Sequence, residues 1–554
     1  MEARLHLLSG NQPLRIGARI RPTGAMNMKS SSLPSVIALT VFFAVAGSGA
    51  VALEEPVPLT SGLVAGVELD SGVRVFRGIP FAAPPVGDLR WQAPRPPIPW
   101  KGVLEADSFA PVCMQQRTAA LMSEDCLYLN VWTNAQSADK GRPVMVWIHG
   151  GGWSSGAGAN VGSSSTRITG TYDGEAFAEN GVVLVSVNYR LGAFGFMAHP
   201  ELSVESDRGV SGNYGILDHI AALEWVRDNI AGFGGDPGNV TIFGESAGGA
   251  SVYALLATPL ASGLFHKAIG QSVWVTTANM THLKRNNGLS DSAESRGRQA
   301  VEAKLNELGI AGDGDLLATM RSLAADDVLN MQHRVSLVED GWMFPDSPAR
   351  IFAKGSHNVV PLLAGSNDGE GLLFVNQENS FATAAEQRAA REAEFGEFAG
   401  DLLDYYVAQS DEDVLTVDID YNSDSWFARP TREVVNAMAK TAADSFMYVF
   451  TRNLQDPTQR SPHAMELRYV FDELPESASE VDRNIARLLN DYWTQFAATG
   501  NPNRSGLPAW PVYELETQRH QIIGAEVGQG SFFRKDQLDE LDRYLNDRYD
   551  SAER

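Results

Sequence analysis

The chain has 554 residues, of which 44% are hydrophobic and 20% are charged, and its formal net charge is −24 at pH 7. Enough apolar side chains are present for a large core, which excludes a globally disordered chain. The acidic balance argues against nucleic acid as a partner, because nucleic acid requires a basic surface, and against tight binding to anionic membranes.

The first part of the chain has the pattern of a targeting segment. Residues 1–25 show no strong apolar period, so we expect an upstream extension outside the fold. Residues 26–52 combine a lysine, a short apolar run and the small residues Ala50-Val51-Ala52, which is typical of a signal peptide cleaved before Leu53. The run is too short to span a membrane, so we expect an exported protein, periplasmic or secreted, without a membrane-spanning segment in its mature form. An uncleaved N-terminal anchor is the alternative.

Two cysteines occur in the chain, Cys113 and Cys126. In an exported protein, an even number of cysteines at short separation favours one disulfide. Two buried free thiols are the alternative.

Short apolar runs recur along the chain and alternate with helical patterns. The predicted strands cover residues 64–67, 73–76, 123–132, 143–148, 182–187, 240–243, 266–272, 359–365 and 446–450. Strands that alternate with helices at this spacing predict an α/β fold with a mostly parallel central sheet and helices on both faces. We interpret residues 53–554 as one domain, with charged helical insertions near 275–345 and 375–445 that form a cap above the sheet.

A glycine-rich loop, His149-Gly150-Gly151-Gly152-Trp153, follows the strand predicted over 143–148. Its glycines expose backbone N–H groups and carry no side chain that would block approach. Fixed donors of this kind can stabilise an oxyanion. A flexible glycine linker is the alternative.

The pentapeptide Gly244-Glu245-Ser246-Ala247-Gly248 lies between an apolar strand and a helix of small residues. In this context the motif is typical of a nucleophile elbow, since its glycines let strand and helix pass closely. A helix that starts just after Ser246 directs its N-terminal N–H groups at negative charge that develops there. We therefore predict Ser246 as a nucleophile; the alternative is a glycine-rich turn with an incidental serine.

A nucleophilic serine needs a base, and the base needs an acid that orients it. Both follow the serine in chains with this elbow. His463 and His520 lie far enough downstream, and we favour His463 because it lies in a loop after a strand, whereas His520 lies in a polar C-terminal segment. Asp368 and Glu370 both follow a predicted strand, so both qualify as the acid.

Further motifs extend the pattern over roughly residues 60–515. They are Gly78-Ile79-Pro80-Phe81, Glu124-Asp125-Cys126-Leu127-Tyr128-Leu129-Asn130, Gly150-Gly151-Gly152, Asn188-Tyr189-Arg190-Leu191-Gly192, Gly244 to Gly249, Glu370-Gly371, His463 with Glu466-Leu467, Thr499-Gly500-Asn501-Pro502-Asn503 and Trp510-Pro511. In number and order they resemble the type-B carboxylesterase and cholinesterase family of α/β-hydrolases, and in particular its bacterial para-nitrobenzyl-esterase-like carboxylesterases. The resemblance implies the α/β-hydrolase fold.

The resemblance also implies roles for residues. Ser246 corresponds to the nucleophile, Glu370 to the acid and His463 to the base. Where the family usually has Asp-Glu-Gly, this chain has Gly369-Glu370-Gly371, which keeps Asp368 as a second candidate acid.

Other positions match supporting parts of the family site. The implied oxyanion donors are the N–H groups of Gly151, Gly152 and Ala247. The implied supports are a Cys113–Cys126 disulfide, an Arg90–Glu124 salt bridge beside it, and Ser272 behind the acid.

The implied activity is hydrolysis of small to medium carboxylic esters through an acyl-enzyme, with a small-molecule ester as partner and neither metal nor organic cofactor. Glu245, Trp153 and Trp274 are the candidate substrate-binding residues, and Trp274 lies where the family lines its acyl pocket. We predict that choline esters are not preferred: recognition of a quaternary ammonium relies on aromatic faces, and the loop between Cys113 and Cys126 contains none. The alternative is that an aromatic residue from the insertions takes that place. The sequence does not define an oligomeric state.

Two other classes stay open. One is a non-catalytic adhesion protein of the same fold, which the presence of all three candidate catalytic residues argues against. The other is a serine hydrolase that acts on different bonds, such as an amidase, a lipase or a cholinesterase.

Overall fold

A computed structural model describes residues 55–553, except 117, 119, 137–140, 160–168, 275–279, 287–290 and 311–313, together with the pair Ile20–Arg21. The predicted signal peptide, residues 26–52, lies outside the described residues. Within the predicted upstream extension, Ile20–Arg21 forms a two-residue strand, β1, that pairs antiparallel with β6 (Val103–Glu105). This pair lies at one end of a small sheet of order β1-β6-β3-β2, in which β3 is Gly62–Ala65 and β2 is Val57–Leu59.

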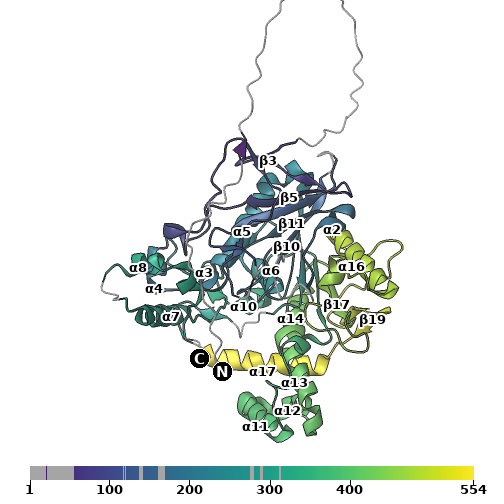
Figure 1. Cartoon of the computed structure of the whole chain (residues 1–554). Coiled ribbons are helices and arrows are strands. Elements are labelled where there is room, and N and C mark those ends of the chain that lie inside the picture. Colours follow the sequence, from purple (N-terminus) through teal and green to yellow (C-terminus); the bar gives the residue numbers. More distant parts are fainter. Residues whose placement is uncertain are drawn as a thin grey trace, which may run out of the picture.

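An 11-stranded sheet forms the centre of the molecule (Figure 1). Its order is β19 (Val527–Ser531), β18 (Arg519–Ile523), β17 (Ser445–Phe450), β16 (Leu362–Asn367), β13 (Lys267–Gln271), β12 (Gly235–Glu245), β10 (Arg142–Ile148), β11 (Val183–Val187), β9 (Tyr128–Thr133), β5 (Arg74–Pro80) and β4 (Val67–Glu68). Neighbours from β11 to β18 are parallel, and the outer pairs are antiparallel. The predicted mostly parallel sheet is therefore confirmed. Strands β18 and β19 also belong to it and are not among the predicted strands.

The two faces of the sheet belong to separate hydrophobic cores. Along β10, Val144, Val146 and Ile148 contribute to one core, and Met145 and Trp147 to the other. Alternation of this kind follows from the period-2 geometry of a strand. Because both faces are covered, β10 reads as an almost continuous apolar run.

Helices cover both faces. The helices are α2 (Glu175–Glu179), α3 (Gly192–Phe196), α4 (Pro200–Glu205), α5 (Tyr214–Asn229), α6 (Ala247–Ala257), α7 (Ala293–Leu308), α8 (Leu316–Ser322), α9 (Ala325–Leu329), α10 (Pro348–Ala353), α11 (Ala384–Phe395), α12 (Ala399–Tyr406), α13 (Val414–Ser423), α14 (Arg429–Met438), α15 (Leu467–Val470), α16 (Glu480–Thr499) and α17 (Lys535–Glu553). The first core contains residues of α5 and α6, and the second contains residues of α2 and α16. None of the helices in the described ranges is long and apolar enough to cross a membrane.

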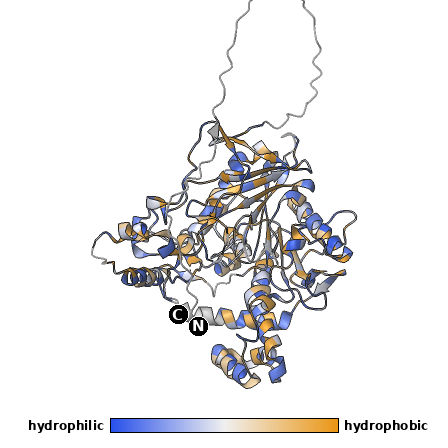
Figure 2. Cartoon of the chain, viewed as in Figure 1, coloured by the Kyte–Doolittle hydropathy of each residue, from blue (hydrophilic) through white to orange (hydrophobic). Residues whose placement is uncertain are grey.

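The segments predicted as insertions form helical groups at the border of the sheet. Helices α7 to α9 belong to the first, and Figure 2 shows α7 mostly in the blue of hydrophilic residues. The second contains α11 to α14, with the π-helix η8 (Asp424–Ala428) between α13 and α14. In Figure 1 the long helix α17 crosses the lower part of the molecule, and α11 and α12 of this group lie below it. Leu538 and Leu541 of α17 share a third, smaller core with α11, α12 and η8.

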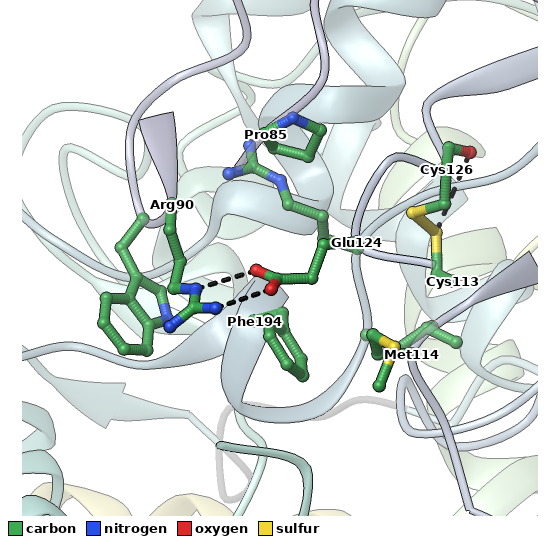
Figure 3. A pocket seen from close by; sticks show the side chains of 10 residues that line it. Pro85, Arg90, Cys113, Met114, Glu124, Cys126 and Phe194 are labelled. Carbon is green, nitrogen blue, oxygen red and sulfur yellow. Dashed lines mark hydrogen bonds and ion pairs between the residues drawn. A yellow bond between two sulfur atoms is a disulfide. The ribbon is translucent and has the colours of Figure 1, made fainter. Parts of the chain in front are cut away.

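A disulfide and an ion pair stabilise the loops before β9. The disulfide joins Cys113 to Cys126, the pairing that the resemblance implies. Arg90 donates through Nε and Nη2 to the two carboxylate oxygens of Glu124, at 2.7 and 2.5 Å, beside that disulfide (Figure 3). Arg90 Nη1 also donates to the carbonyl of Leu323, so the pair connects these loops to the first insertion.

Candidate active site

Ser246 lies at a sharp turn between β12, which ends at Glu245, and α6, which begins at Ala247. Its backbone angles, φ 57° and ψ −121°, are strained for a residue with a side chain. Two features hold this turn. The Ser246 N–H donates to the carbonyl of Gln271 at 3.0 Å, and a Cβ at Gly248 would lie 2.0 Å from the carbonyl oxygen of Ile148. Only glycine permits that approach, so the motif glycine is required by packing.

The glycine loop after β10 lies beside this turn. A Cβ at Gly150 would lie 3.1 Å from the Cβ of Ser246. Gly151 and Gly152 have φ of 102° and 61°, in the region that glycine favours. Within the described part of the chain, the N–H groups of Gly151, Gly152 and Ala247 donate to no protein acceptor. Unpaired backbone donors next to the serine are what an oxyanion site requires.

The carboxyl of Glu370 is fully buried and held on both oxygens. Its Oε2 lies 2.5 Å from Nδ1 of His463, while Oε1 accepts from the Ser272 hydroxyl at 2.6 Å and from the Asn367 N–H at 2.7 Å. Asp368 instead accepts the N–H of Ser461 at 2.7 Å. The structure thus brings Glu370, and not Asp368, against the imidazole.

The alternative histidine lies elsewhere. His520 is buried on β18, at the border of the sheet, and its Nδ1 lies 3.1 Å from the carbonyl of Gln518. The polar segment in which the sequence placed it is a strand.

Glu245 contacts the other side of the His463 ring. Its Oε1 lies 3.0 Å from Nε2 of His463, and its side chain is 4% exposed, so it faces the histidine rather than open solvent. Among the described residues, His463 makes its polar contacts with Glu245 and Glu370 and not with the hydroxyl of Ser246. Free enzymes often hold such catalytic hydrogen bonds long or poorly aligned until substrate binds.

Two nearby carboxyls set the protonation of His463. Burial disfavours the charged imidazolium, but Glu245 and Glu370 outweigh burial and raise the pKa of His463 well above 6.5. Burial also raises the pKa of the Glu245 carboxyl, against the opposing attraction of His463. The imidazole is therefore more basic than an exposed histidine.

A further buried acid, Glu466, connects the parts of this site. Glu466 accepts from Gln271 Nε2 at 3.0 Å and from Asn367 Nδ2 at 2.7 Å, and Asn367 Nδ2 also donates to the carbonyl of Pro462 at 2.8 Å. Burial, and then the charges of the neighbouring carboxyls, raise the pKa of Glu466 to about 8. Neither Glu466 nor Asn367 has a role that the sequence alone predicts; the available signal is their proximity in sequence to His463 and Glu370.

Two aromatic rings pack against the buried imidazole of His463. The ring centroids of Phe427 and Phe374 lie 4.4 and 5.0 Å from the imidazole, and Trp426 packs on Phe374 at 5.7 Å while remaining 42% exposed. No sequence motif predicts these aromatic residues at the site, because they come from the second insertion and from the turn after Glu370.

The predicted substrate-binding tryptophans lie on a different side. Trp153 is buried, donates through Nε1 to the Ser251 hydroxyl at 3.0 Å, and packs against the half-buried Trp274 at 5.4 Å. Trp153 is thus part of the core beneath the glycine loop, and Trp274 is the more accessible of the pair. Within the described ranges, no three His, Cys, Asp or Glu side chains are arranged to hold a metal ion.

A parallel sheet of this order, with a serine at a strained strand–helix turn, an acid after β16 and a histidine after β17, is the arrangement of an α/β-hydrolase. Comparison with known proteins agrees with this assignment. The sequence model of the carboxylesterase family matches residues 54–540.

Relatives match over most of their length. A fumonisin B1 esterase of Sphingopyxis macrogoltabida is 38% identical over 85% of this chain and 86% of its own. A para-nitrobenzyl esterase of Bacillus subtilis is 35% identical over 83% of this chain and 92% of its own. A solved PNB esterase structure has a TM-score of 0.74 and 34% identity, covering 88% of this chain and 99% of that one. The chain belongs to the carboxylesterase family and is an enzyme that hydrolyses carboxylic esters.

Proposed function

We propose that this enzyme cleaves small to medium carboxylic esters through an acyl-enzyme, with Ser246 as nucleophile, His463 as base and Glu370 as the orienting acid. The observation that carries the proposal is the 2.5 Å contact of Glu370 with Nδ1 of His463, while Nε2 lies 3.0 Å from Oε1 of Glu245, the residue that directly precedes Ser246. Because Glu370 accepts the Nδ1 proton, Nε2 is the nitrogen free to take a proton.

The reaction follows from these positions. His463 Nε2 takes the proton of Ser246 as its Oγ attacks the ester carbonyl. The N–H groups of Gly151, Gly152 and Ala247 stabilise the negative charge on the carbonyl oxygen. His463 then donates its proton to the leaving alcohol, the carbon–oxygen ester bond breaks, and an acyl group remains on Ser246. Water, deprotonated by the same histidine, releases the acid and restores the serine.

We expect Glu245→Gln to move the acid limb of the pH profile of kcat/KM to lower pH by about one unit. A general base must be neutral, so activity rises as the pH passes through the pKa of His463, which Glu245 and Glu370 raise. Loss of one of these charges lowers that pKa, and activity then extends to lower pH. The profile is measured with a neutral ester, and exposed Glu201→Gln is the control. If the midpoint of the acid limb of kcat/KM stays at the same pH or moves to higher pH, Glu245 does not raise the pKa of His463.

We further propose that the substrates are uncharged esters. No aromatic residue occurs in the loop from Cys113 to Cys126, and the Glu245 carboxyl faces His463, so neither offers a site for a quaternary ammonium. We expect kcat/KM for a neutral butyryl thioester to equal or exceed that for butyrylthiocholine. A series of p-nitrophenyl esters of increasing acyl length then defines the preferred acid. A clear preference for the cationic substrate would contradict this assignment.

Export is the cellular setting that we infer. The disulfide between Cys113 and Cys126 supports it, since disulfides persist in oxidising compartments. The signal-like residues 26–52 support it from the sequence. N-terminal sequencing of the exported protein measures directly whether cleavage occurs before Leu53.

A further inference from the structure

An ion pair connects the start of α17 to the second insertion. Arg534, the residue before α17, donates through Nε to Oδ2 of Asp424 at 2.9 Å and lies 2.8 Å from its Oδ1. The Asp424 side chain is fully buried, and its Oδ2 also accepts the hydroxyl of Tyr406 at 2.8 Å. Burial raises the pKa of Asp424 to about 6, and the charge of Arg534 opposes that rise. Arg534 therefore favours the ionised form of this buried carboxyl.

Asp424 is the first residue of η8, the π-helix that packs on His463. Phe427 follows on the same turn, and its ring centroid is 4.4 Å from the imidazole. Phe374 stacks on Phe427 at 5.6 Å and also contacts the imidazole. The position of η8 therefore determines how Phe427 packs against the His463 ring.

A second contact leads from Arg534 to the loop that carries His463. Arg534 Nη2 lies 3.5 Å from Oδ2 of Asp420, and Asp420 Oδ1 lies 2.5 Å from Nη1 of Arg460. Arg460 precedes His463 by three residues, and the intervening Ser461 donates to Asp368. Arg534 thus contacts η8 through Asp424, and it is linked through Asp420 and Arg460 to the loop that carries His463.

The rest of α17 is docked through a separate set of charges. Asp542 lies 2.8 Å from Nε of Arg429 and 2.6 Å from Nη2 of Arg432, both on α14. Arg429 pairs with Glu433, which accepts the hydroxyl of Tyr253 on α6, the helix that starts after Ser246. These ion pairs fix α17 on α14. The backbone next to Arg534 therefore has a fixed position relative to Asp424.

We propose that Arg534 is a positioning residue for the catalytic histidine: by pairing with Asp424 it holds η8 and its Phe427 against the imidazole of His463. The proposal rests on the role of His463 in the proposed function. Without Arg534, the Asp424 carboxylate is buried without a counter-charge, and it must take up a proton or move toward water. Either change shifts the start of η8. Small displacements of catalytic groups cost up to about a hundredfold in rate, because the reacting atoms are no longer aligned.

The test compares Arg534→Gln with Arg534→Lys and with Arg543→Gln. Arg543 lies on α17, is 56% exposed, and pairs with Glu540 of the same helix and, at 3.7 Å, with Asp401 of α12, so it controls for the loss of an arginine charge near the second insertion. For a small neutral ester we expect Arg534→Gln to lower kcat about tenfold or more, with KM within about twofold, because substrate contacts remain while the base is misaligned. Arg534→Lys retains the charge and should restore most of kcat. Arg543→Gln should match the unaltered enzyme.

Thermal unfolding followed by circular dichroism separates positioning from stability. An Arg534→Gln protein that keeps the kcat of the unaltered enzyme, with or without a lower Tm, would overturn the proposal. If that variant does not fold, Asp424→Asn replaces it, because it removes the charge while keeping the shape and the Tyr406 hydroxyl as a partner. We expect the same loss of kcat, and a normal kcat in folded Asp424→Asn would overturn the proposal equally.

The Ser246→Ala variant separates a failure of this proposal from a failure of the proposed function. A fully active Ser246→Ala would remove the proposed mechanism itself. An inactive Ser246→Ala together with a fully active Arg534→Gln would remove only the positioning role of Arg534.

Discussion

Replacing Ser246 with alanine is expected to lower kcat by about 10⁴-fold or more while the protein stays folded. The loss is large because nucleophile, base and acid act as one unit, and the residual rate comes from substrate binding and the oxyanion donors. Stability should change little. The turn is held by backbone contacts, namely the Ser246 N–H with the Gln271 carbonyl and the close approach of Gly248 to Ile148, and alanine keeps all of these.

The measurement is kcat for a p-nitrophenyl ester on protein whose circular dichroism matches that of the unaltered enzyme. Ser262→Ala, at an exposed serine beyond α6, is the control and should retain full activity. A folded Ser246→Ala with more than about 1% of the original kcat would reject Ser246 as the nucleophile.

Glu370→Gln is expected to lower kcat by about 10³-fold or more, because a neutral amide at this position no longer holds His463 in the tautomer with Nε2 free. An amide also brings an N–H₂ group into a site built for an acceptor. The Ser272 hydroxyl and the Asn367 N–H both donate to Oε1, so the amide oxygen takes that position and the N–H₂ group faces Nδ1 of His463, which can then no longer carry its proton there.

Asp368→Asn is the matched variant, because it makes the same chemical change two residues away. The Asp368 carboxyl accepts the N–H of Ser461 and does not contact the imidazole, and an asparagine oxygen can keep that hydrogen bond. We expect a loss of at most about tenfold, through a small shift of the loop that carries His463. Equal losses in the two variants, or a larger loss in Asp368→Asn, would transfer the role of acid to Asp368.

Much of the fold follows from local sequence pattern. The apolar runs of β10, β11 and β12 predict central strands because both faces of these strands are buried. The elbow around Ser246 can be recognised because its motif is continuous in sequence between a strand and a helix, although Gly248 is required by the close approach of Ile148 on the neighbouring strand β10. The strands β18 and β19 escaped prediction because they lie at the border of the sheet, where polar residues such as Arg519 and Gln529 face outward.

The surroundings of His463 depend on contacts between distant segments, and the sequence carries little signal for them. Phe427 contacts the imidazole because the second insertion packs against His463. No sequence pattern near His463 predicts this contact. Glu245 is part of the elbow motif, so its identity was visible, but its contact with Nε2 of His463 depends on how two loops meet. For Trp153 the sequence position is misleading in the opposite way. This tryptophan directly follows the glycines of the loop, yet its side chain packs into the core.

The docking of α17 also has a consequence for biosynthesis. Arg534 pairs with Asp424, and Asp542 with Arg432, across a sequence separation of 110 residues in each case. A ribosome therefore completes the central strands up to β17 and the whole second insertion long before it supplies these partners. Until then Asp424, Arg429 and Arg432 have no counter-charges from the last helix, and the third core lacks Leu538 and Leu541. A nascent chain that stalls, or that is clipped before α17, would present unpaired charges and an open apolar groove, the features by which chaperones and proteases detect incomplete proteins.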